Sequence, residues 1–227
     1  MLTDLAWLAL EVKYLPPARS FYEETLDLSI ADERATEISY EVGPSTLILR
    51  RPSEIPRGGI HTHFACSIPA ESYEAWWHRL DAAHDLEEFQ FGDARSLYLY
   101  DPDGNCVELG QRDVSGPGIC GIFEVALEVG SLDRAETFYE ALGFETVDRG
   151  TDRRRIRMAG PMALELWEPQ LGIADARGGV HVDLGFSCED PDRVVDTVDS
   201  LACRTDRTDD GRVVVDPDGH HLTLIDR

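Results

Sequence analysis

Short segments of alternating apolar and polar residues recur along the chain, interrupted by turns and by a few stretches with helical spacing. Residues 5–12 alternate as a half-buried strand does. Pro16 and Pro17 follow, and proline is tolerated in the first turn of a helix, so a helix is expected near residues 18–26. Short strands are then predicted near residues 28–33, 35–42 and 45–51.

The same order of elements returns three more times. A second unit has a strand from Ile60, a helix near 70–84 and two strands at 96–101 and 105–111. The elements of a third unit are a strand at 123–129, a helix near 132–144 and three short strands, the last at 162–169. The elements of a fourth unit are a strand at 180–188, a helix near 190–202 and a final hairpin. The pattern therefore predicts four strand–helix–strand–strand–strand units.

Short repeated segments divide these units into two halves. The segment ALEV and the pair Phe-Tyr each recur 117 positions later, at residues 9–12 and 126–129 and at residues 21–22 and 138–139. RGGIH at 57–61 returns as RGGVH at 177–181, and DPDG at 101–104 returns at 216–219. Such self-similarity indicates a tandem duplication. The predicted domains are residues 1–113 and 119–227, joined by a Gly-, Ser- and Pro-containing linker at 114–118.

The helix ends FY-E-x-L-x-L and FY-x-x-L-G-F, together with the ending DPDG-N-x-x-E-L, make the chain resemble the vicinal oxygen chelate superfamily. That superfamily includes glyoxalase I, bleomycin-resistance proteins, fosfomycin-resistance proteins and extradiol dioxygenases. The resemblance implies an α+β fold with two tandem paired-unit domains, each with a curved mixed sheet around a cup. It also implies that a ligand or a metal binds in the cup. The reaction does not follow from it, because one fold supports unrelated chemistries.

Metal ligands of this superfamily come from the first and the closing strand of each unit. In the first half those positions hold Trp7 and Ile48, which cannot bind a metal, and then His63 and Glu108, which can. His61 lies two residues before His63 and hence on the same face of its strand. It is a further pocket candidate.

In the second half the resemblance places three carboxylates and one threonine at the ligand positions. These residues are Glu124, Glu165, Asp183 and Thr223. His181 and His221 precede Asp183 and Thr223 by two residues, so they join Trp7 as candidate pocket residues. Two simpler interpretations compete: His61 and His181 share a repeated loop that enters a strand, and carboxylates are frequent throughout this acidic chain.

Charge narrows the range of partners. The chain has 44 acidic and 21 basic residues and a formal net charge of −23. Such a surface repels nucleic acid and anionic lipid, which require phosphate neutralisation. The composition resembles that of proteins from salt-loving archaea, in which salt screens self-repulsion. The first residues lack a basic leader and a cleavage site, which favours a cytoplasmic protein, and either a monomer or a homodimer fits the sequence.

Two functional hypotheses follow. In the first, the protein is a metal-dependent lyase or dioxygenase that uses Mn, Fe, Ni or Zn on a small oxygen-rich molecule, and Glu108 or Glu124 binds the metal or moves a proton. In the second, it is a metal-free protein that binds small molecules, as bleomycin-resistance proteins do. Trp7 and Thr223, which stand at ligand positions, favour the second hypothesis. Any metal is expected in one half only.

Overall fold

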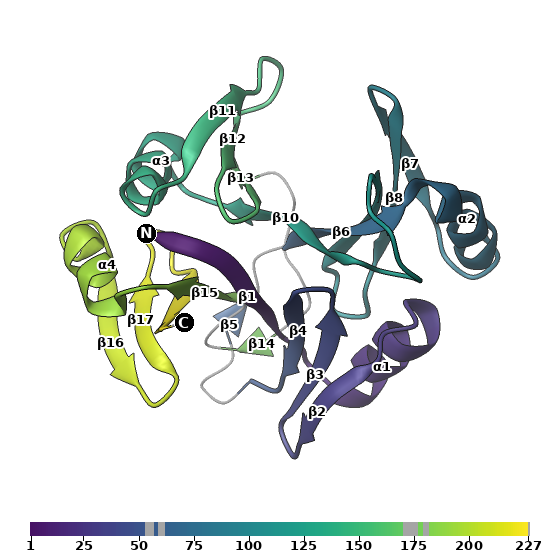
Figure 1. The fold of residues 1–227 in the computed structure, drawn as a ribbon, viewed down its shortest axis with the longest axis horizontal. Helices are drawn as coiled ribbons and strands as arrows, with labels where there is room; N and C mark the ends of the chain where they lie inside the picture. The colour runs from purple at the N-terminus through teal and green to yellow at the C-terminus, as the bar shows by residue number, and fades with distance from the viewer. Residues whose placement is uncertain (53–56, 59–61, 170–176, 179–181, 227) are drawn as a thin grey trace.

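The computed structural model describes residues 1–52, 57–58, 62–169, 177–178 and 182–226. Four units with the predicted order of elements follow one another along this part of the chain (Figure 1). The first unit contains β1 (Leu2–Glu11), α1 (Leu15–Ser20), η1 (Phe21–Thr25), β2 (Ile30–Arg34), β3 (Glu37–Val42) and β4 (Ser45–Arg50). The second contains β6 (His63–Pro69), η2 (Ala70–Ser72), α2 (Tyr73–Asp81), β7 (Glu87–Phe91), β8 (Ala94–Tyr100) and β9 (Cys106–Arg112).

The second half of the chain repeats this order. The third unit contains β10 (Gly121–Glu128), α3 (Leu132–Ala141), β11 (Glu145–Arg149), β12 (Arg155–Ala159) and β13 (Ala163–Trp167). The fourth contains β15 (Val182–Cys188), α4 (Pro191–Val198), β16 (Arg204–Thr208), β17 (Gly211–Val215) and β18 (His221–Asp226). Two short strands, β5 (Arg57–Gly58) and β14 (Arg177–Gly178), pair with each other.

The four units build two curved eight-stranded sheets, and each sheet joins one unit from each half. Sheet I has the strand order β16-β17-β18-β15-β1-β4-β3-β2, so it unites the first and fourth units. Sheet II has the order β11-β12-β13-β10-β6-β9-β8-β7 and unites the second and third. In both sheets the two opening strands pair antiparallel, β1 with β15 and β6 with β10. The predicted α+β fold with two curved mixed sheets is confirmed.

The pairing of units differs from the expected one, in which each half closes its own cup. All four opening strands carry a similar alternating pattern, so nothing in that pattern selects which two of them pair. The sequence division at residues 114–118 stays a prediction.

Turns and helices, rather than a shared sheet, hold the two units of each half together. The Tyr22 hydroxyl of the first unit donates to Asp101 Oδ2 in the first DPDG turn, at 2.8 Å. The Tyr139 hydroxyl donates to Asp216 Oδ2 in the second turn, at 3.0 Å. Correspondingly, α1 and α2 lie at one end of the molecule and α3 and α4 at the other (Figure 1).

Local sequence accounts for most element boundaries. Proline stands at the start of α1, as predicted, and the Asp190 side chain accepts from the backbone N–H of Arg193 at the start of α4. Each DPDG turn places its glycine at positive φ, 86° for Gly104 and 98° for Gly219, a conformation that a side chain would strain. Strand β7 is an element that the sequence analysis missed, because all five of its residues are exposed and show no alternation of burial.

Alternation along the strands separates the core from the inner faces of the sheets. In sheet II, Phe64, Val107, Val125 and Leu164 are fully buried in the hydrophobic core. Their neighbours in sequence project from the opposite face, because successive strand side chains alternate. Trp76 on α2 also packs into the core, with 6% of its surface exposed.

Candidate metal centre on sheet II

The strands that carry candidate ligands stand side by side in sheet II, in the order β13-β10-β6-β9. They bring together the four candidates His63, Glu108, Glu124 and Glu165. Register explains the grouping: Ala126 of β10 lies opposite both His63 and Glu165, whereas Ala65 of β6 lies opposite both Glu108 and Glu124. All four side chains therefore share the inner face of one sheet.

Three of these residues form a compact group of potential metal ligands. One ligand atom each from His63, Glu108 and Glu124 lies within 4.8 Å of the other two. His63 Nε2 is 3.0 Å from Glu108 Oε2. Glu108 and Glu124 are both buried, with 3% and 5% of their surface exposed. His63 and Glu108 belong to the first half and Glu124 to the second, so this candidate ligand group spans both halves, whereas the sequence led us to expect any metal in one half only.

Glu108 is held in its ionised form. Burial by itself would raise the pKa of its carboxyl group, but the hydrogen bond and charge of His63, together with Ser96 and Tyr98, outweigh burial. The pKa of Glu108 therefore lies below its ordinary value. The same negative charge, added to burial, raises the pKa of the neighbouring Tyr98 far above its ordinary value, so this phenol keeps its proton.

Glu124 is shifted in the opposite direction. Burial is the largest cause and the nearby Glu165 carboxylate the next, and together they raise the pKa of Glu124 above its ordinary value. The guanidinium of Arg157, which contacts Glu124 Oε2, offsets only part of this effect. The metal-free centre thus contains two carboxyl groups with separated proton affinities, and Glu124 holds a proton more tightly than Glu108 does.

Glu165, the fourth residue, accepts from three donors of its own sheet. Arg155 Nη1 and Arg157 Nη1 lie 3.1 Å and 2.9 Å from Oε1, and Trp167 Nε1 lies 2.9 Å from Oε2. Glu165 therefore lies near Glu124, with which it was grouped from the sequence, but its carboxylate is engaged by these donors. It acts on the centre through its charge, by raising the pKa of Glu124.

Sequence reasoning missed the residues that surround the group. Tyr98 stands opposite Glu108 across the β8–β9 pair, and its ring centroid is 5.5 Å from that of His63. Phe89 of β7 packs against Tyr98 with the two rings nearly perpendicular and their centroids 5.2 Å apart. Arg155 and Arg157 alternate on β12, and this two-residue spacing was the one signal that both point to the same face as Glu165.

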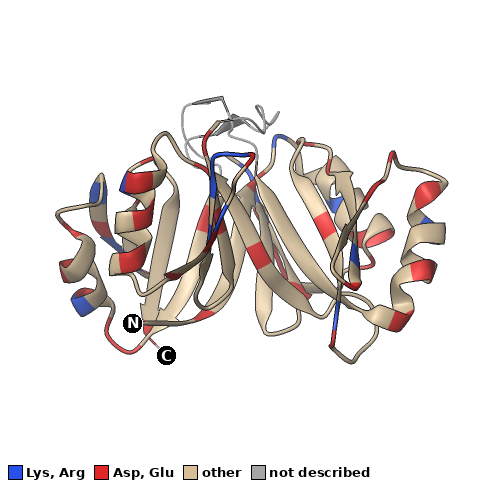
Figure 2. Ribbon diagram, turned by 90° about the horizontal axis from the view of Figure 1, so that it is seen from above, with Lys and Arg blue, Asp and Glu red and all other residues tan. Residues whose placement is uncertain are grey.

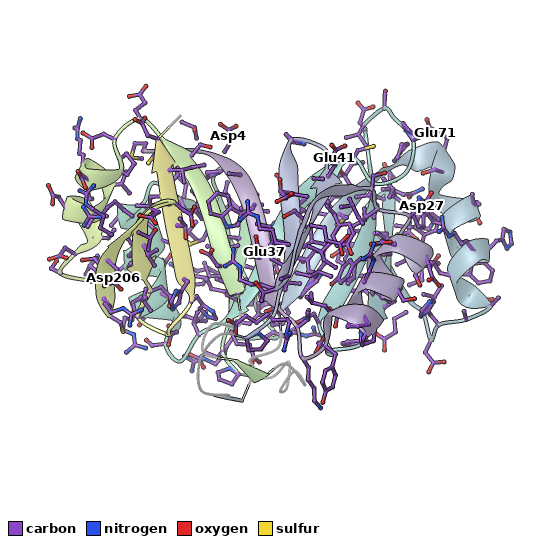
Figure 3. The ribbon with its side chains drawn as sticks, turned by 90° about the horizontal axis from the view of Figure 1, so that it is seen from below. Asp4, Asp27, Glu37, Glu41, Glu71 and Asp206 are labelled. Carbon is purple, nitrogen blue, oxygen red and sulfur yellow. The ribbon has the colours of Figure 1, made fainter. Side chains whose placement is uncertain are left out.

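Sheet I places different chemistry at the equivalent positions. Asp183 accepts from Thr223 Oγ1 at 2.8 Å and from Trp7 Nε1 at 3.2 Å. Arg50 lies 3.5 Å from the same carboxylate and 2.7 Å from Glu37, which is at the centre of Figure 3. Asp183 is thus surrounded by donors and lies in the other sheet from Glu124 and Glu165, with which the sequence analysis grouped it.

The remaining candidates have simpler positions. His221 is partly buried on β18 and lies opposite Asp183 in the parallel β15–β18 pair. His61 and His181 lie outside the described residues. His220, to which the sequence analysis gave no role, is buried with Nε2 2.7 Å from the backbone oxygen of Glu128.

The donor set on sheet II fits a divalent metal. Imidazole and carboxylate together suit Mn, Fe, Ni and Zn, whereas a site of oxygen ligands alone would favour Mg or Ca. Burial first, and then the neighbouring carboxylates of Glu165 and Glu108, raise the pKa of Glu124, and a bound cation would relieve the repulsion among these carboxylates. His63, Glu108 and Glu124 are the residues that would hold such a cation.

Comparison with known proteins supports this fold. No protein-family model matches the sequence. Metallothiol transferase FosB of Staphylococcus epidermidis is 27% identical over 115 residues, which cover 48% of this chain and 81% of that protein. A putative dioxygenase from Bacillus subtilis superposes with a TM-score of 0.72 at 15% identity, over 99% of this chain and 85% of that one.

Glyoxalase I from Zea mays superposes with a TM-score of 0.71 at 20% identity, over 98% of this chain and 92% of that one. The protein therefore has the vicinal oxygen chelate fold that its sequence motifs predict. In the described residues no helix combines the length and apolar character needed to span a bilayer.

Proposed function

We propose that this protein, which has the vicinal oxygen chelate fold, is a divalent-metal-dependent enzyme of the glyoxalase or dioxygenase type that acts on a small oxygen-rich molecule. One observation carries the proposal. The four strands of sheet II that carry family ligand positions lie side by side. They bring one ligand atom each of His63, Glu108 and Glu124 within 4.8 Å of one another. The similarity to a metallothiol transferase agrees with it.

The two carboxyl groups take different roles in this proposal. Glu108, with its lowered pKa, stays ionised beside His63 and serves as a permanent anionic ligand. Glu124, the third candidate ligand, exchanges a proton at a carboxylate oxygen with the substrate as general base and then general acid. When bound, the metal supplies Lewis acidity that polarises substrate oxygens.

The surroundings of the centre favour a substrate with an apolar body and negatively charged or strongly polar oxygens. Phe89 and Tyr98 present aromatic surface on one side of the group. Arg155 and Arg157 present guanidinium groups on the other side, from β12. A guanidinium is well suited to carboxylate or phosphate oxygens because its donors match them in pairs.

A metal-binding measurement tests this proposal. Protein purified without a nickel column and stripped with chelator is titrated with Mn²⁺, Zn²⁺, Ni²⁺ and Fe²⁺ in a calorimeter. We expect one cation per chain. His63→Ala and Glu108→Gln should weaken binding by at least roughly a hundredfold, since even the loss of groups behind the ligands costs about 10- to 100-fold.

Asp183→Asn provides the matched control, because Asp183 is the carboxylate of sheet I at the position equivalent to His63. It should bind the cation as the wild type does. The proposal fails when no cation binds the wild type, or when Asp183→Asn lowers affinity as strongly as His63→Ala does.

A metal-free binding protein of the bleomycin-resistance type is the second candidate. This candidate is supported by Arg157, whose positively charged guanidinium contacts both Glu124 and Glu165. The two carboxylates therefore have a positive partner without a metal. Absence of a bound cation, combined with retention of a small ligand on sheet II, would favour this function over the first.

A further inference from the structure

Arg157 occupies an unusual place beside the candidate centre. It stands on β12, directly across from Glu165 of β13, and its guanidinium reaches over that strand to Glu124 of β10. One of its nitrogens, Nη1, lies 2.9 Å from Glu165 Oε1, while the other contacts Glu124 Oε2. A single cationic side chain thus bridges a residue of the ligand group and its charged neighbour.

Charge within the group shows what Arg157 does in the metal-free protein. Glu108, Glu124 and Glu165 place three carboxylates on one face, and all three are buried. The guanidinium of Arg157 contacts both Glu124 and Glu165. It therefore does part of what a bound cation does: it supplies positive charge to a buried carboxylate.

The neighbouring Arg155 lacks this connection. It also lies close to Glu165, at 3.1 Å, but its other guanidinium nitrogen contacts Asp148 of β11 at 2.6 Å. Arg155 and Arg157 occupy the same face of the same strand, so they differ chiefly in the contact with Glu124.

Sheet I offers an internal comparison. The cross-strand pair equivalent to Arg157 and Glu165 is Ser39 and Ile48 there, and Trp7 stands where Glu124 does. None of these three equivalent positions on sheet I is charged, and the arginine that bridges two carboxylates there, Arg50, stands at another position, between Glu37 and Asp183.

We propose that Arg157 is a resident counter-cation that competes with a divalent metal for Glu124, and so sets the affinity of the centre. A metal that takes Glu124 as a ligand meets a guanidinium on the same carboxylate, and like charges so close repel each other. Cation binding displaces the guanidinium from Glu124, and Arg157 then keeps Glu165 as its partner. This inference rests on the proposed metal function.

The test compares cation affinity by calorimetry in the wild type, Arg157→Gln, Arg157→Lys and Arg155→Gln, each stripped with chelator and checked by circular dichroism. Arg157→Gln should bind Mn²⁺ or Zn²⁺ about 10- to 100-fold more tightly than the wild type, because the competing charge is gone. Arg155→Gln should change affinity by less than about threefold. Arg157→Lys retains the charge and should remain closer to the wild type than Arg157→Gln does.

The outcomes separate this inference from the proposed function. Binding by the wild type with no tightening in Arg157→Gln overturns the inference and leaves the metal function in place. Binding by Arg157→Gln alone supports the inference and overturns the metal function of the natural protein. Binding by neither protein overturns both the inference and the metal function. Equal tightening in Arg155→Gln and Arg157→Gln overturns only the specific role of Arg157.

Discussion

At the scale of single residues, environment gives chemically identical side chains opposite properties. Glu124 and Glu136 belong to the same unit and are both buried. Burial and the nearby Glu165 raise the pKa of Glu124, whereas the hydrogen bond from Arg149 is the main cause that lowers the pKa of Glu136 on α3. The first residue therefore costs stability when it is ionised, and the second contributes stability.

This contrast predicts opposite effects of the same substitution in the metal-free protein. At pH 7, Glu124→Gln should raise Tm by a few degrees, because it removes a carboxylate that the fold disfavours in its ionised form, and Arg157 still has Glu165. Glu136→Gln should lower Tm by a similar amount, because Arg149 and Thr146 lose a charged acceptor. Thermal melts of the chelator-treated proteins measure both shifts.

The sign of the pH dependence provides the control. The folded protein binds the Glu124 proton more tightly than the unfolded chain does, so the penalty grows as pH rises from the ordinary pKa of a glutamate, about 4.3, to the raised value. The stability from Glu136 is present above that ordinary pKa and is lost as pH falls through the lowered one. Both differences should vanish at strongly acidic pH, and shifts of equal sign at pH 7 would contradict this account.

Only part of the centre was predictable residue by residue. His63 and Glu108 follow from motif positions, because a ligand's place within a unit is fixed by its strand. Arg157 could not be assigned a role in the same way, since its partner Glu124 lies two strands away in sheet II. Its importance depends on that contact across the sheet, which the local sequence does not encode.

At the scale of elements, the repeated DPDG turn connects units rather than only closing a hairpin. Asp101 accepts from the backbone N–H groups of Asp103 and Asn105 within its own turn, and from the Tyr22 hydroxyl of the preceding unit. Both the tyrosine and the turn were visible as repeats in the sequence. Their contact was not, because 79 positions separate the two residues.

This contact predicts a matched loss of stability in the two halves. Tyr22→Phe and Tyr139→Phe should each lower the free energy of unfolding by about 1–3 kcal/mol, since each removes a donor from a buried aspartate. Tyr14→Phe is the control, because Tyr14 is 62% exposed, and it should cost less than about 0.5 kcal/mol. Urea denaturation measures all three, and a loss confined to one half would show that the turns are not equivalent.

At the scale of the whole molecule, the arrangement of sheets decides which residues meet. Sorting the ligand positions by half left two incomplete sets, His63 with Glu108 and Glu124 with Glu165 and Asp183. Sorting them by sheet gives one set with ligand chemistry at every position and another with Trp7, Ile48 and Thr223 at three of the four. The sequence predicted the number and order of units, but long-range pairing of β1 with β15 and of β6 with β10 determined the site.

Charge is also a property of the whole molecule. Acidic residues are spread over the helices and both sheets in Figure 2, and the labelled side chains of Figure 3 come from four different elements and one connection, with Asp27 following η1. Several arginines form surface ion pairs with acidic residues, such as Arg34 with Asp32, but exposed pairs of this kind contribute little stability. The net charge of −23 therefore remains as a destabilising self-repulsion.

Salt should relieve this repulsion, since the screening length falls from about 10 Å at 0.1 M to about 3 Å at 1 M. We expect the Tm of the metal-free protein at pH 7 to rise by about 5 °C or more between 0.1 M and 1 M KCl. The same series near pH 4.5, the isoelectric point of the sequence, separates screening from general salt effects, because net repulsion is absent there. The rise should then shrink markedly. A Tm that falls with KCl at pH 7, or that rises equally at both pH values, would mean that self-repulsion does not limit the stability of this fold.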